Sequence, residues 1–254
     1  MAQELHRATI RVLDILECLS AASDGMTLTE LAQALSAPKS SLFPIVHTLE
    51  QRQYLQQRFG TTRYMIGPSS LVLGSAYALN SGIMAFTDVI KQVVAACQET
   101  CQLGVLDQGN VLYIAKEDSP EAIRMISRVG NRLPANATAI GKALLSGLTD
   151  TEVRELYANG LPRLTSHTIT NISALLSQLS DIRNGGMASE REESTPQLAC
   201  WALPLYQGGK VFAALSVSVP LFRCEPGKIE LICQSLQKAK TKIEQLAEMQ
   251  SFGI

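Results

Sequence analysis

Apolar residues recur with helical spacing in three stretches near the N-terminus. In chain order they are Leu5, Ala8 or Thr9, Val12, Leu16 and Leu19; then Leu28, Leu31, Ala32 and Leu35; then Leu42, Ile45, Val46 and Leu49. Steps of three and four residues place each group on one face of a helix. The pattern therefore predicts three short amphipathic helices that share one core.

Turn and strand signals separate and follow these helices. Thr27 or Thr29 can cap the second helix, and Pro38 suits the first turn of the third, where its missing N–H costs nothing. Short β-prone runs follow at Tyr54–Gln57 and Arg63–Ile66. This order of elements predicts a winged helix-turn-helix, a motif that puts a helix into the major groove of DNA.

The third helix and the wing supply the candidate DNA contacts. These are Lys39, Ser40, Ser41, Phe43, His47, Arg58 and Arg63. Pro44 cannot donate to the carbonyl of Ser40, so we expect the third helix to bend or loosen there. Because many winged helices bind proteins, a protein-binding module stays open as an alternative.

Charge gives this region no general attraction to DNA. The chain of 254 residues carries a net charge of −1. Within residues 1–70 the basic residues Arg7, Arg11, Lys39, Arg52, Arg58 and Arg63 balance the acidic residues Glu4, Asp14, Glu17, Asp24, Glu30 and Glu50. Phosphate contacts supply most of the non-specific affinity for DNA. Because this region has no surplus of positive charge, those contacts depend on where its few basic side chains lie. A single copy would bind weakly, so we expect a homodimer or homotetramer.

The rest of the chain mixes helices and strands. The pattern predicts a connecting helix over 71–79 that ends near 81–82, then a helix from Ile83 to about Thr100, strands at Gln102–Asp107, Val111–Lys116 and Ala122–Val129, helices at Thr138–Leu148, Thr151–Tyr157 and Ile172–Arg183, strands at Ala199–Tyr206 and Val211–Val219, and a helix at about Lys228–Met249. Helices and mainly antiparallel strands indicate an α+β sensor-like domain. The expected domains are 1–67 (winged helix-turn-helix), 68–82 (linker helix) and 83–254 (effector binding and oligomerisation).

A set of polar side chains on the predicted sheet is a candidate ligand site. Ser216 and Ser218 are two residues apart on a strand, so their hydroxyls point to the same side. The neighbouring strand brings Cys200 beside them, and such groups bind carboxylate or hydroxyl oxygens. The helix that starts after Thr138 offers backbone N–H groups to an anion. The competing interpretation is that both serines face solvent on a half-exposed sheet.

Neither enzyme motifs nor targeting signals stand out. The chain has no GxSxG, P-loop, GxGxxG or HExxH pattern. The run Glu190–Glu193 either supplies a general base or is a solvated surface, and an enzyme that uses Cys200 or Glu190 on a small acid stays the main alternative to a regulator.

Cys97 and Cys101, four residues apart on one expected helix, either bind a metal or are small buried residues, and we favour the latter. No signal peptide or membrane span is apparent, so we expect a cytoplasmic protein. We expect no metal and no cofactor.

The sequence resembles the IclR-type bacterial transcriptional regulators over nearly its whole length. ATIRVLDILECL resembles the first helix of that family, and APKSSLFPIVHTLEQRQYL its recognition segment. LPANATAIGKALLSGL resembles a hallmark at the start of the effector domain. GMASEREESTPQLACWALPLY is similar to the family signature, with Gly186, Glu193, Cys200 and Ala202 at the expected places.

The resemblance implies an α+β regulator with an N-terminal winged helix-turn-helix and a C-terminal α/β effector-binding domain of the GAF/PAS-like type. It implies palindromic operator DNA as one partner and a small organic, sugar or aromatic acid as effector. The implied effector-binding residues are Ala139, Ile140, Glu190, Cys200, Ser216 and Ser218. Whether the protein is a repressor or an activator stays open.

Departures from the family pattern bear on specificity. Glu190 stands where the signature has Asp, and its carboxylate would oppose a ligand carboxylate unless it accepted a ligand hydroxyl. We therefore hypothesise an effector that carries a hydroxyl as well as an acid group. Three further departures concern Trp201, Gln207 and Phe43-Pro44. In the family pattern, a small aliphatic residue stands in place of Trp201, an Asp or Asn in place of Gln207, and a more polar pair in place of Phe43-Pro44. Phe43 can touch thymine methyl groups but cannot hydrogen-bond base edges.

Overall fold

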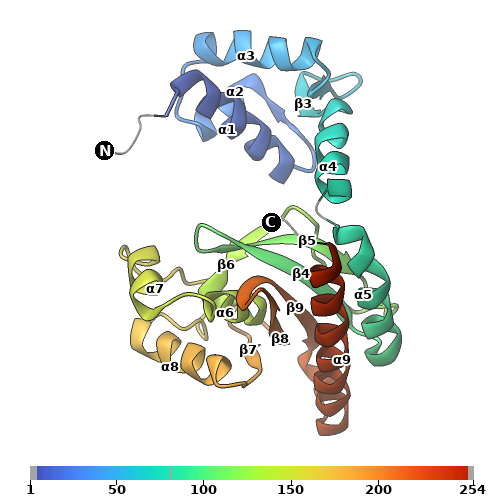
Figure 1. Cartoon of the computed structure of the whole chain (residues 1–254). Helices are drawn as coiled ribbons and strands as arrows, with labels where there is room; N and C mark the ends of the chain where they lie inside the picture. Colours follow the sequence, from blue (N-terminus) through green and yellow to red (C-terminus); the bar gives the residue numbers. More distant parts are fainter. Residues whose placement is uncertain (1–4, 81, 251–254) are drawn as a thin grey trace. The chain divides into compact units, whose positions relative to one another are not determined.

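The structure is a computed structural model that describes residues 5–80 and 82–250. The chain divides into two compact units, residues 1–80 and 81–254, and Figure 1 shows the elements of each. The end of the connecting helix that we expected near residues 81–82 falls partly outside the described residues. Within the described residues no helix is long and apolar enough to cross a membrane.

The first unit is a winged helix-turn-helix. Its elements are α1 (Arg7–Ala21), β1 (Met26–Thr27), α2 (Leu28–Ala34), α3 (Lys39–Gln51), β2 (Leu55–Gln57), β3 (Arg63–Ile66) and α4 (Ser69–Asn80). The strands form an antiparallel sheet in the order β1-β3-β2. Strand β1 was not predicted, because two residues are too few to show an alternating pattern.

Local signals explain how α2 begins and how the three helices pack. Of the two threonines considered, Thr27 caps α2: its hydroxyl accepts the N–H of Glu30, and the Glu30 carboxylate accepts the N–H of Thr27. The core holds the predicted apolar residues of α2 and α3, together with Ile15 and Leu19 of α1. The predicted first stripe is wrong at its start, since Leu5 precedes α1 and is exposed.

The second unit contains one antiparallel sheet between helices. Its elements are α5 (Ile83–Cys97), β4 (Thr100–Asp107), β5 (Asn110–Glu117), β6 (Arg132–Pro134), η1 (Ala135–Ala137), α6 (Ala139–Leu145), α7 (Asp150–Leu156), α8 (Ile172–Arg183), β7 (Ala188–Arg191), β8 (Leu198–Gln207), β9 (Lys210–Pro220), η2 (Leu221–Arg223) and α9 (Pro226–Gln250). The strand order is β6-β5-β4-β9-β8-β7.

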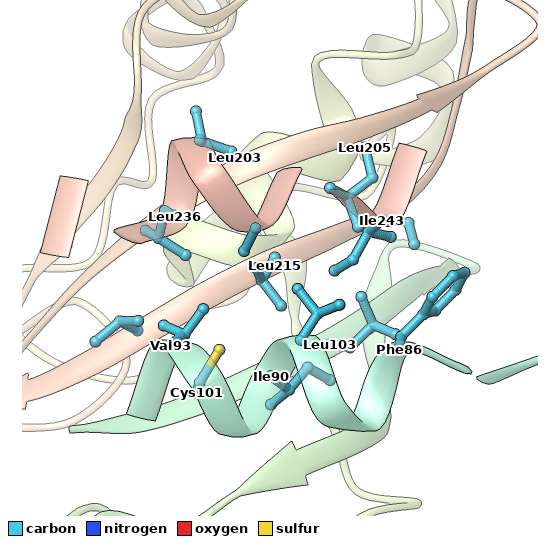
Figure 2. Close-up of a cluster of buried hydrophobic side chains, with 14 of the residues drawn as sticks. Phe86, Ile90, Val93, Cys101, Leu103, Leu203, Leu205, Leu215, Leu236 and Ile243 are labelled. Carbon is cyan, nitrogen blue, oxygen red and sulfur yellow. The ribbon is translucent and has the colours of Figure 1, made fainter. Parts of the chain in front are cut away.

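The two faces of this sheet have different cores. On one face, Leu103, Leu203 and Leu215 pack with residues of α5 and α9, as Figure 2 shows around Phe86, Ile90 and Ile243. On the other face, apolar residues of β5, β7, β8 and β9 pack with α6, α7 and α8, which lie on the opposite side of the sheet from α5 and α9 (Figure 1). This second face carries the candidate ligand site.

Three predictions in this unit are wrong. Ala122–Val129 is not a strand but part of the connection between β5 and β6. The first long helix ends at Cys97 and not near Thr100, because Gln98 takes the left-handed conformation (φ 58°). Cys97 and Cys101 therefore lie on a helix and a strand, not on one helix. Both are buried apolar residues, and no group of three or more metal-ligating side chains occurs in the described residues.

Candidate DNA-binding and effector-binding sites

Helix α3 presents most of the predicted DNA contacts to solvent. Lys39, Ser40, Phe43 and His47 are exposed, and Ser41 is half-buried. The Phe43 side chain is 54% exposed, and its ring stacks on that of His47 at 6.0 Å between centroids and 8° between planes. The two rings are nearly parallel and lie on the exposed side of α3.

The helix continues across Pro44. The hydroxyl of Thr48 donates to the Pro44 carbonyl at 2.7 Å. The expected loosening does not interrupt α3, which is helical over Lys39–Gln51. Three buried residues on its inner face, Leu42, Val46 and Leu49, hold it against the core, so tertiary packing outweighs the missing hydrogen bond.

The two wing arginines are not equivalent. The Arg58 side chain is 54% exposed, and its guanidinium forms a surface ion pair with Asp24 at 3.3 Å. The Arg63 guanidinium donates to the carbonyls of Asp24 (3.2 Å) and Gly25 (2.9 Å) and pairs with Glu30 at 3.1 Å. Arg63 therefore joins β3 to the turn before β1 and to α2, a structural task that its sequence position did not reveal.

The predicted ligand residues of β8 and β9 lie together and are buried. Cys200 pairs with Ser218 in the strand register, and Ser216 and Ser218 are 2% and 1% exposed. Both serines alternate with Leu215 and Val217, which pack in the α5 and α9 core, so the hydroxyls point to the opposite face. The interpretation that these serines face solvent is therefore wrong.

A chain of hydrogen bonds links these residues to β4. The Cys200 thiol donates to the Ser218 hydroxyl at 3.3 Å, and that hydroxyl donates to Oε1 of Gln102 at 3.1 Å. Glu190, opposite Cys200 in the register of β7 and β8, is 3% exposed. We call Gln102, Glu190, Cys200, Ser216 and Ser218 the polar cluster. The sequence pattern did not predict Gln102 as a member of this cluster, because its place beside Ser216 depends on the non-local pairing of β4 with β9.

The acidic run is not a solvated surface. Glu190 and Glu193 are buried, whereas Arg191 between them is exposed. The Glu190 carboxylate accepts the Glu193 N–H (2.8 Å) and the Ser194 hydroxyl (2.9 Å). Burial nonetheless raises the pKa of Glu190 above its usual value, because it removes water from the charged form. Glu190 thus organises the loop after β7.

Tyr113 and Cys200 show how closed this region is. Burial raises the pKa of the Tyr113 hydroxyl, and the nearby Cys200 and Glu190 raise it further. Burial also raises the pKa of the Cys200 thiol well above its usual value, again with Glu190 adding to the effect. A thiol held protonated in this way is a poor nucleophile. The geometry therefore argues against an enzyme that uses Cys200.

The α6 residues lie beside this cluster. Ala139 and Ile140 are buried in the core of this face, and the Thr138 hydroxyl caps α6 by accepting the Gly141 N–H at 3.0 Å. Gly141 has no room for a side chain, since a Cβ would lie 2.2 Å from the Ala135 carbonyl oxygen. This close approach fixes how η1 leads into α6.

A buried ion pair supports the loop after β7, and sequence reasoning did not predict it. The Lys142 ammonium lies 2.5 Å from Oε1 of Glu193 and donates to the Ser189 carbonyl at 3.2 Å. The Thr168 hydroxyl donates to the Glu193 carbonyl at 2.7 Å, and the Thr165 hydroxyl donates to the Glu192 carbonyl at 2.6 Å. Helix α6, the loop before α8 and the loop after β7 are thereby joined at one point.

Comparison with known proteins agrees with this architecture. Residues 8–58 match the IclR helix-turn-helix domain, and residues 77–245 match the family described as bacterial transcriptional regulator IclR C-terminal. The HTH-type transcriptional regulator BhcR of Paracoccus denitrificans is 32% identical over 98% of this chain and 87% of its own length.

Two solved structures share the fold. An IclR transcriptional regulator from Alicyclobacillus acidocaldarius has a TM-score of 0.86 at 24% identity, covering 95% of this chain and 99% of its own. An IclR homologue from Microbacterium hydrocarbonoxydans, solved in complex with 4-hydroxybenzoate, has a TM-score of 0.77 at 21% identity, covering 94% of this chain and 99% of its own.

The curated relatives are named as transcriptional regulators and not as enzymes. The matched helix-turn-helix domain likewise favours DNA binding over a protein-binding winged helix. With both of its units matched and a relative above 30% identity over nearly its full length, this chain belongs to the IclR family of helix-turn-helix transcriptional regulators.

Proposed function

We propose that this protein binds operator DNA through α3 and the wing, and that a small organic or sugar acid bound at the polar cluster controls that binding. The observation that carries the proposal is a set of buried polar groups on a sheet face whose other residues form an apolar core. Buried polar groups cost free energy unless they are hydrogen-bonded. Because Nε2 of Gln102 in this cluster has no partner among the described residues, a ligand is the group that would satisfy it.

The proposed effector-binding residues are Ala139, Ile140, Glu190, Cys200, Ser216 and Ser218. We expect the Ser216 hydroxyl to donate to the carboxylate of the acid. Two lysines near the cluster are already paired, Lys142 with Glu193 and Lys116 with Asp118. Neutral donors therefore supply most of the recognition. The 4-hydroxybenzoate bound by the Microbacterium homologue is an acid of suitable class.

Entry of this ligand requires part of the domain to open. Cys200, Ser216 and Ser218 are each 7% exposed or less. The connection between β5 and β6 is the candidate for movement, because most of residues 120–131 are exposed and its apolar side chains Ile123 and Ile126 are 65% and 85% exposed. Loops with few buried contacts open at low free-energy cost.

The DNA-binding role rests on Lys39, Ser40, Ser41, Phe43, His47, Arg58 and Arg63, with Phe43 reading bases and the cations contacting phosphates. We propose that two or four copies act together in the cytoplasm, where bacterial DNA lies. Helix α4 supports self-association, since Leu71, Val72, Leu73 and Leu79 are all more than half exposed. Exposed apolar patches of this kind mark interaction sites.

A gel-shift titration tests this function. The full-length protein should shift DNA from upstream of its own gene more strongly than random DNA of equal length, and the binding should weaken with salt. A panel of small acids should then release or strengthen the complex without being consumed. A chain that shifts both DNAs equally, or that turns over an acid of the panel, would contradict the proposal.

A further inference from the structure

An unpaired donor lies inside the polar cluster. Gln102 of β4 is 1% exposed and is paired with Ser216 of β9 and Lys116 of β5 in the strand register. Its neighbours Cys101 and Leu103 pack in the α5 and α9 core, so the Gln102 side chain points to the face of the polar cluster. Its Oε1 accepts the Ser218 hydroxyl, but its Nε2 is buried and has no hydrogen-bond partner among the described residues.

An unpaired amide in this position has a cost. More than nine-tenths of buried polar groups in proteins are hydrogen-bonded, and leaving one unpaired costs about 1–3 kcal/mol. Exchanging the oxygen and nitrogen of the Gln102 amide does not remove the problem. Nε2 would then meet Ser218 and Oε1 would be left unpaired, so one atom of the amide lacks a partner in either orientation.

A second unpaired group lies on the segment beside Gln102. The Lys116 ammonium donates to the Ser127 carbonyl at 2.6 Å and to the Asp118 carboxylate at 2.9 Å, which ties the β5–β6 connection to the strand next to Gln102. Ser127 is 6% exposed, and its hydroxyl also has no partner among the described residues. Lys116 is fully used as this tie, so the groups left to a ligand here are neutral.

Glu190, by contrast, already accepts three hydrogen bonds from the protein. Its carboxylate accepts the N–H of Glu193 and both the hydroxyl and N–H of Ser194. Three of the about four acceptor positions of this carboxylate are thereby used, so Glu190 is less available to a ligand hydroxyl than the Gln102 amide is. A hydroxyl both donates and accepts, so it can satisfy the Gln102 amide in either orientation.

We infer that Gln102, together with Ser127 on the segment that Lys116 ties to β5, is a specificity-determining residue that reads a hydroxyl group of the effector. The effector class is then a small acid that carries at least one hydroxyl in addition to its carboxylate. This inference rests on the proposed function of the polar cluster. It adds two residues on β4 and the β5–β6 connection to a site otherwise formed by α6, β7, β8 and β9.

Calorimetric titration with matched pairs of acids tests this inference. The probes are 4-hydroxybenzoate with benzoate, glycerate with propionate, and gluconate with hexanoate, each titrated into the full-length protein. We expect the hydroxylated member of at least one pair to bind about tenfold more tightly, the value of one additional hydrogen bond. Gln102→Met, which keeps the length of the side chain without its amide, should reduce this difference to less than about threefold.

Two further variants provide a matched control and an independent test. Gln237→Met changes an exposed glutamine on α9 and should keep the full preference. Ser127→Ala removes only an unpaired hydroxyl, so it should fold like the native protein and still weaken the hydroxylated probe several-fold. It tests the inference even where Gln102→Met does not fold.

The opposite results would overturn the inference. They are equal binding of both members of every pair by the native protein, a preference that survives Gln102→Met or Ser127→Ala, or no binding by any probe. In each case, sequence-specific binding of upstream DNA would still support the regulator function, so the two proposals fail separately.

Discussion

The Lys142 ammonium and the Glu193 carboxylate form an ion pair at 2.5 Å with side chains that are 0% and 9% exposed. The pair connects α6 to the loop that follows β7, and the N–H of Glu193 holds the Glu190 carboxylate. A buried pair adds little net stability, but removing one partner leaves an uncompensated charge. Its role is to fix the loop beside the polar cluster.

Replacing Lys142 by Met should therefore lower the free energy of unfolding by about 3–5 kcal/mol, because Glu193 would stay buried without its cation. Urea unfolding followed by the fluorescence of Trp201, the only tryptophan of the chain, measures this loss. The double variant Lys142→Met, Glu193→Leu should recover much of it. As a control, Asp88→Ala breaks an exposed pair with Lys91 and should cost less than about 1 kcal/mol. Equal effects of Lys142→Met and Asp88→Ala would show that the buried pair has no such role.

The raised pKa of Glu190 predicts a pH-dependent effect of Glu190→Gln. Since burial raises the folded-state pKa above the usual 4.5, the native state binds this proton more tightly than the unfolded chain. The resulting stabilisation is complete below the unfolded pKa and is lost as pH rises through the folded pKa. Gln does not titrate, so the variant should gain stability relative to the native protein as the pH rises from the unfolded pKa, until the pH has passed the folded-state pKa. Urea titrations at several pH values measure the difference, and a constant difference would contradict the prediction.

The two wing arginines should respond differently to replacement. Arg63→Ala removes donors from the carbonyls of Asp24 and Gly25 and should destabilise the sheet β1-β3-β2 by about 1–3 kcal/mol. Arg58→Ala should leave the sheet intact and weaken binding to all DNA sequences similarly, since phosphate contacts carry no sequence information. Hydrogen exchange of the full-length protein measures the first effect, and fluorescence anisotropy with specific and random duplexes the second. Unchanged exchange in Arg63→Ala would refute its structural task.

Phe43 should contribute to sequence discrimination. Its exposed ring, stacked on His47, can contact thymine methyl groups in the major groove. Phe43→Ala should weaken operator binding by about 1–3 kcal/mol while random duplexes lose little, and Phe43→Leu should keep part of the preference. Anisotropy titrations at one salt concentration compare the two duplexes. An equal loss on both would argue against base reading by Phe43.

Local patterns along the chain predict most helices and the long strands β4, β5, β8 and β9. The capping box at Thr27, the apolar stripes of α2 and α3, and the alternation along β9 are all visible within a few residues. The errors occur where local signals are weak or conflict. Ala122–Val129 is apolar enough for a strand, yet in the folded chain it forms a largely exposed connection.

The candidate site was predictable only in part. Ser216, Ser218 and Cys200 could be brought together because one hairpin joins their strands. The place of Gln102 and the pairing of Lys142 with Glu193 depend on contacts between residues that lie 116 and 51 positions apart in the chain. The burial of Glu190 and Glu193 was hidden for the same reason, since an acidic run has the local pattern of a surface.

DNase I footprinting of the DNA upstream of the gene tests the central claim most directly. The native protein should protect a palindrome whose half-sites are about one or two helical turns apart, and a small acid that binds the protein should change this protection. Arg58→Ala should weaken protection of all DNA, and Phe43→Ala should reduce the difference in protection between the operator and the flanking DNA. Uniform protection of the whole fragment, or a footprint that no bound acid alters, would contradict the account of a metabolite-controlled, sequence-specific regulator.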